Sequence, residues 1–142
     1  MKVSARNIFK GPISAIKTGI VNAEVAVSIG GNDTLVAVVT MESLNALELK
    51  TGKDVVALVK APWVMLMSEG SDIRLSARNS LTGTVKSVEV GTVNAEVSIS
   101  LPGGSEVASV VTKEAAAELG LRPGVPVTAV IKASNVILGV PA

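Results

Sequence analysis

The sequence of 142 residues contains no cysteine and no histidine. This absence excludes disulfides, thiolate nucleophiles, zinc sites of the usual Cys/His type, Ser-His-Asp triads and histidine acid–base catalysis. Aromatic side chains are nearly absent too, because Phe9 and Trp63 are the only two. The repeated glutamates form no acid–base pair, so we expect neither an enzyme, nor a catalytic cofactor, nor a metal ion held directly by side chains.

The sequence also lacks an excess of charge of either sign. Lys and Arg number 13 and Asp and Glu number 12, for a net charge of +1. A nucleic-acid-binding protein normally carries a basic face, and a single-strand binder carries aromatic residues on which bases stack. We therefore expect no nucleic-acid partner.

Long hydrophobic runs are missing as well. No apolar run approaches the roughly 20 residues of a membrane helix, and residues 1–6 lack the apolar segment of a secretory signal. We expect no membrane association and a cytoplasmic location. Hydrophobic residues still make up 48% of the chain, which is enough for a packed core.

The sequence repeats itself at a shift of 72 positions. Val21–Val25 (VNAEV) returns unchanged as Val93–Val97, and about 26 of roughly 64 aligned residues are identical without a gap. This indicates a tandem duplication, with units at residues 1–67 and 74–142 and a polar linker at 68–73.

Each repeat is patterned as short strands. Residues 21–29 alternate between apolar and polar residues, end at a Gly-Gly-Asn-Asp turn and are followed by a return strand at 35–39. A short helix is expected at 40–49 and again at 113–119, followed by the last strands at 55–60 and 64–67. This order predicts a mainly all-β chain of two tandem OB-like five-stranded barrel units, each with one short helix.

A unit of about 65 residues buries only around 60% of its chain surface and is marginally stable alone. We therefore expect the two units to pack together and the chain to oligomerise.

Both repeats retain the same polar residues, and nearly all of these are hydrogen-bond donors. Such a set, with two positive charges per repeat, matches a fully deprotonated dianionic oxyanion. Taken singly, each residue also has an ordinary structural explanation, such as a solvated Arg or a Thr that caps a helix. The donor group consists of Ser4, Ala5, Arg6, Asn7, Thr40, Lys60 and Ala61, and Ser76, Ala77, Arg78, Asn79, Thr112, Lys132 and Ala133.

Two further polar pairs recur. Asn22 and Asn94 are unusual because asparagine is disfavoured within strands, so each is either a turn residue or a residue facing a symmetry axis. Glu24 and Glu96 also recur, and a surface position explains them without a chemical role.

The motifs S-A-R-N, V-N-A-E-V, V-V-T-x-E and K-A-x-x-V, present in both repeats, resemble the molbindin family, also called Mop domains. Members of this family are small cytoplasmic molybdate-binding proteins, and the duplicated arrangement is similar to their tandem form. The resemblance implies OB-like units, a homotrimer of tandem chains that forms a pseudo-hexamer, and storage of molybdate or tungstate.

The resemblance also implies where the ligand binds. One unit would supply the Ser-Ala-Arg-Asn segment and the Lys-Ala pair, and a neighbour would supply hydroxyls from its helix start: Thr40 and Ser43, or Thr112. Ala115 replaces Ser43 in the second repeat, so the two classes of site should differ by about 1 kcal/mol for one lost hydrogen bond. Asn22 and Asn94 are candidates for a further site on the threefold axis.

Two other functions remain open at this stage. An OB-type nucleic-acid module would show salt-dependent binding to oligonucleotides. An OB-type effector module that acts in trans on a transporter or regulator would copurify with its partner and would not retain molybdate.

Overall fold

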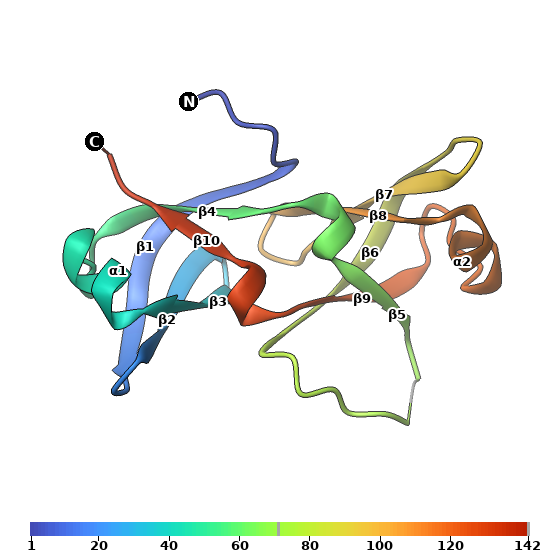
Figure 1. Cartoon of the computed structure of the whole chain (residues 1–142). Helices are drawn as coiled ribbons and strands as arrows, with labels where there is room; N and C mark the ends of the chain where they lie inside the picture. Colours follow the sequence, from blue (N-terminus) through green and yellow to red (C-terminus); the bar gives the residue numbers. More distant parts are fainter. Residues whose placement is uncertain (71, 142) are drawn as a thin grey trace.

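The computed structural model describes residues 1–70 and 72–141, so Ser71 of the linker and Ala142 lie outside the described residues. The chain is built mainly of strands, and each repeat carries one short helix (Figure 1). The prediction of two OB-like units is confirmed. In the first repeat the elements are β1 (Asn7–Thr18), β2 (Asn22–Gly30), β3 (Asp33–Thr40), α1 (Met41–Ala46), β4 (Asp54–Val59), the 3-10 turn η1 (Ala61–Trp63) and β5 (Met65–Ser68).

The second repeat has the same order of elements. They are β6 (Asn79–Val90), β7 (Asn94–Ser100), β8 (Glu106–Thr112), α2 (Lys113–Glu118), β9 (Pro126–Ile131), η2 (Ala133–Asn135) and β10 (Ile137–Gly139). Each helix begins after a threonine whose hydroxyl accepts a backbone N–H: Thr40 from Ser43 and Thr112 from Ala115. The helix starts expected from the sequence therefore rest on ordinary N-caps.

The two repeats exchange their last strands. One sheet has the order β10-β4-β1-β2-β3 and the other has the order β5-β9-β6-β7-β8. Each sheet thus takes four strands from one repeat and its fifth from the other, as Figure 1 shows for β10 beside β4 and β5 beside β9. The repeats of the sequence and the sheets of the fold are therefore different divisions of the chain.

The first strand of each repeat serves two neighbours. β1 pairs with β4 through its first half and with β2 through its second half, and the register shifts between Ile13 and Ala15. β6 shows the same shift between Val85 and Ser87. A bulge of this kind bends a strand, which lets the sheet curl around its apolar face.

Gly11 of β1 and Gly83 of β6 allow these strands to pass very close to the ends of β2 and β7, which lets the sheets curl tightly. A Cβ at Gly11 would lie 1.8 Å from the carbonyl oxygen of Ser28, and one at Gly83 would lie 2.4 Å from that of Ser100. The alternating residues then point into the barrels, where Val25, Val27, Val97 and Ile99 are fully buried. Buried residues of both sheets join in one hydrophobic cluster, so the units share a core.

Candidate functional site

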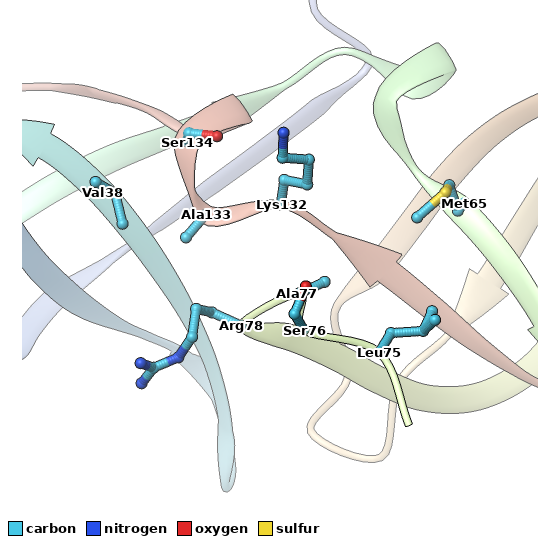
Figure 2. A pocket seen from close by; sticks show the side chains of 9 residues that line it. All are labelled: Val38, Met65, Leu75, Ser76, Ala77, Arg78, Lys132, Ala133 and Ser134. Atoms are coloured by element: carbon cyan, nitrogen blue, oxygen red, sulfur yellow. The ribbon is translucent and has the colours of Figure 1, made fainter. Parts of the chain in front are cut away.

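Most of the predicted donors of the second repeat line one cavity of about 370 Å³ between the two units. Five of its lining residues belong to the set predicted from the sequence, and we name them the second-repeat cluster: Ser76, Ala77, Arg78, Lys132 and Ala133. Figure 2 shows the residues before β6 on one side of this cavity and the start of η2 on the other, with Val38 of β3 and Met65 of β5 at its ends. Leu75 and Ser134 complete the lining.

Strand pairing brings the two halves of this cluster together. β6 and β9 are antiparallel neighbours, and Asn79 pairs with Ile131. Arg78 lies one residue before Asn79 and Lys132 one residue after Ile131, so the two cations leave the sheet at the same place. The chain turns there into η2, which packs against β3 of the first unit.

Arg78 is engaged by a carboxylate of the other repeat. Its Nη1 donates to Oε2 of Glu24 over 2.8 Å, and the two side chains are 54% and 31% exposed. An ion pair this exposed contributes about 0–1 kcal/mol. A dianion that enters the cavity can therefore compete with Glu24 for the guanidinium at little cost.

The corresponding residues of the first repeat form the first-repeat cluster: Ser4, Ala5, Arg6, Lys60 and Ala61. Arg6 contacts Glu96 through both of its terminal nitrogens, at 2.5 and 2.8 Å. The Nζ of Lys60 lies 5.5 Å from the centre of the Trp63 ring, within the range of a cation–π interaction. The two Arg–Glu pairs occupy equivalent positions, which relates the repeats by an approximate twofold symmetry.

Asn7 and Asn79, which the sequence grouped with the ligand donors, connect the two units. The amide of Asn79 donates to the carbonyl of Val36 over 2.8 Å and accepts from the N–H of the same residue over 2.7 Å. Asn7 makes the equivalent pair of bonds to Ala108 at 2.8 and 2.7 Å. Both asparagines are 2% exposed, and the carbonyl oxygen and one N–H of each side chain are committed to the edges of β3 and β8.

The remaining predicted donors lie outside the cavity. Thr40 and Ser43 are exposed and bond to each other over 3.0 Å, while Thr112 is exposed at the start of α2. Asn22 and Asn94 are not brought together, because each lies in the shallow hollow of its own hairpin, beside Glu24 and Glu96 respectively.

Sequence reasoning missed Val38, Met65, Leu75 and Ser134 in the lining and gave Glu24 and Glu96 no role at the clusters. The repeat carried a signal for three of these six, since Val38 matches Val110 and the glutamates match each other. The arginine partners of Glu24 and Glu96 are 54 and 90 residues away in sequence, a separation that a local pattern does not encode.

The chemistry offered by the cavity is binding of an anion. Two cations, a serine hydroxyl and nearby backbone N–H groups suit the deprotonated oxygens of an anion. In this structure the carboxylate of Glu24 neutralises the charge of Arg78. Over residues 1–70 and 72–141, no group of three or more His, Cys, Asp or Glu side chains could hold a metal ion. In the same part of the chain, no helix has the length and apolar character needed to cross a membrane.

Comparison with known proteins finds relatives over the whole chain. The profile of the TOBE domain family matches residues 3–66 and 75–138. A solved structure of the cytoplasmic molybdate-binding protein ModG with molybdate bound is 66% identical, covers 99% of this chain and 100% of that one, and superposes with a TM-score of 0.94.

Two curated relatives are longer proteins. The molybdenum transport protein ModE of Azotobacter vinelandii is 45% identical over 140 residues, and the molybdenum-pterin-binding protein MopA of Rhodobacter capsulatus is 41% identical over 141. Each match covers 99% of this chain but only 52% and 53% of the relative. The chain thus spans about half the length of these curated relatives.

Proposed function

The chain belongs to the TOBE-domain family as a tandem pair of Mop-type domains, and from this premise we propose that it binds molybdate, and tungstate in the same way, as a store of the oxyanion in the cytoplasm. The observation that carries the proposal is the single cavity that Arg78, Lys132 and Ser76 line together. ModG, which binds molybdate, is similar over essentially its whole length.

The ligand set follows from the two clusters. Arg78 and Lys132 neutralise the two negative charges, while Ser76 and the backbone N–H groups of Ala77 and Ala133 direct donors at the tetrahedral oxygens. The first-repeat cluster acts in the same way through Ser4, Arg6 and Lys60, with Ala5 and Ala61. Within the described residues neither set pairs a nucleophile with a general base, since Glu24 and Glu96 are bonded to the arginines, so binding without turnover is the function proposed.

A second copy of the chain completes each site in this proposal. The cavity is open to solvent, and the helix starts with Thr40, Ser43 and Thr112 are exposed elsewhere on the molecule. A neighbouring copy can therefore present these hydroxyls to the open side. Asn22 and Asn94 lie beside the exposed hairpin tips, where three chains would meet on the threefold axis expected from the sequence.

A titration tests the proposal, because the single tryptophan stands beside Lys60. Molybdate added in an excess of sulfate should give a saturable change in Trp63 fluorescence, with matching heat in calorimetry. The double variant Arg6→Ala, Arg78→Ala should abolish both signals, since each site loses its guanidinium. Arg122→Ala, an exposed arginine outside both clusters, serves as the matched control and should bind as the parent does. No heat and no fluorescence change with the parent protein would refute molybdate binding.

A second candidate function is an effector module that acts on a transporter or regulator. It is favoured by the relatives named ModE, of whose length this chain matches about half. Copurification with such a partner, without retained molybdate, would support it over storage.

A further inference from the structure

The two clusters are equivalent in position but not in their surrounding charge. Glu24, the partner of Arg78, stands opposite Lys17 in the β1–β2 pairing. Glu96, the partner of Arg6, stands opposite Glu89 in the β6–β7 pairing. Each pair of facing residues lines the same hairpin hollow, Lys17 with Glu24 and Glu89 with Glu96.

Directly opposed residues on one face of an antiparallel pair have Cβ atoms about 4.5–5.5 Å apart, so their charges act on each other. In the first unit Glu24 pairs with Arg78 and faces a second positive charge, that of Lys17, across the hairpin. The group of Arg78, Glu24 and Lys17 then carries a formal charge of +1. In the second unit Glu89 adds to the charge of Glu96, and the group of Arg6, Glu96 and Glu89 carries −1.

The lysines of the two clusters differ in a second, independent way. Lys60 lies over the ring of Trp63, whereas the residue equivalent to Trp63 in the second repeat is Asn135. Asparagine has no aromatic ring to attract an ammonium group, so Lys132 has no cation–π contact equivalent to that of Lys60.

Both differences act in the same direction. A dianion at the first-repeat cluster must draw Lys60 from the indole ring and approach two carboxylates. At the second-repeat cluster it approaches one carboxylate, Glu24, which faces Lys17 across the hairpin. We propose that the chain has oxyanion sites of unequal affinity and that the Arg78–Lys132 site fills before the Arg6–Lys60 site. The charges of Lys17 and Glu89 set this order. The proposal rests on the molybdate binding proposed above.

The experiment follows each class of site with its own signal in the intact chain. Calorimetry with molybdate at low ionic strength reports both classes, while the fluorescence of Trp63 reports the first-repeat cluster, because Trp63 touches Lys60 and does not line the second-repeat cavity. We expect two binding phases in the heat and a fluorescence change that follows the weaker one. A single phase, or fluorescence that follows the tighter phase, would overturn the proposal.

Charge reversals give the matched variants. Glu89→Lys should tighten the weaker phase and Lys17→Glu should weaken the tighter phase, each by about three- to tenfold at low salt. Glu118→Lys carries the same charge change on the last turn of α2, outside both hollows, and should alter each phase by less than about twofold. Equal effects of Glu89→Lys and Glu118→Lys would reduce the difference to net charge and overturn the role of residue 89.

Trp63→Asn places the second-repeat residue in the first repeat and should tighten the weaker phase in calorimetry. An unchanged weaker phase in this variant would remove the cation–π contact from the argument. Complete absence of binding by the parent chain is a different result, since it would refute molybdate binding itself and this proposal with it.

Discussion

At the scale of single residues, Asn7 and Asn79 hold the two units of the chain together. Each carboxamide offers one donor and one acceptor in the geometry of a neighbouring peptide group, and it satisfies one residue on the edge strand of the other unit. Unpaired strand edges invite association with other chains. The asparagines therefore cover part of the edges of β3 and β8 while they fix the contact between units.

This role predicts a stability defect for Asn79→Ala. The substitution leaves the N–H and carbonyl of Val36 without partners in a part-buried place, and we expect the free energy of unfolding to fall by about 2 kcal/mol or more. Urea unfolding followed by circular dichroism measures it. Ser80→Ala, at an exposed neighbouring position, should change stability by less than about 0.5 kcal/mol. A loss of molybdate binding at unchanged stability would instead return Asn79 to the ligand set.

The sequence predicted part of this residue scale and not the rest. The identity of S-A-R-N in both repeats marked a group of residues with a shared purpose, and the structure places Ser76, Ala77 and Arg78 on a common cavity with Lys132 and Ala133. The sequence could not separate Asn79 from these cavity residues, because the partner of Asn79 depends on which strand of the other unit lies within reach. A contact between residues 43 positions apart leaves no periodic trace.

At the scale of elements, the exchange of β5 and β10 is the feature that the sequence did not predict. The apolar residues of β5 and β10 suit a sheet edge equally well in either unit. What decides between the sheets is the direction in which η1 and η2 send the chain, and η1 packs on β8 while η2 packs on β3. The hairpin strands β2 and β3 lie close to the ranges predicted for them, because the alternation of 21–29 and 35–39 reflects burial on one face, whereas no bounds were predicted for the long first strands β1 and β6.

The exchange predicts that a substitution in β10 weakens the first unit. Leu138 is 7% exposed and pairs with Ala57 of β4, so Leu138→Ala should cost about 2–4 kcal/mol. Hydrogen exchange should then show the main loss of protection in residues 54–59 of β4, in the first repeat. Ile137→Ala, a neighbouring position that is 53% exposed, is the control with little expected effect. Loss of protection confined to β9 would contradict the exchanged arrangement.

At the scale of the whole molecule, apolar side chains are exposed at both hairpin tips. Ile20 is 98% exposed and Val21 and Val93 are each 69% exposed, close to the hollows that contain Asn22 and Asn94. Apolar groups gathered at one place on a surface are typical of a contact with another chain. The approximate twofold symmetry within the chain gives each end the same kind of tip, so three chains can meet at both ends.

We therefore expect the protein to sediment as three chains, and the double variant Ile20→Lys, Val93→Lys to shift it toward a single chain. Each chain then brings one added charge to each end, so three added charges oppose burial of the tips where three chains meet, while the barrels keep their cores because both side chains are exposed. Sedimentation velocity measures the mass, and circular dichroism checks the fold. Ile8→Lys, at the opposite end of β1 from the tip, controls for the added charge and should remain a trimer. If molybdate is held between copies, the monomeric variant should also bind it more weakly, because Thr40 and Ser43 of a neighbour no longer reach the open cavity. A parent protein that sediments as one chain and still binds molybdate would contradict this expectation. It would show that a single copy forms the complete site.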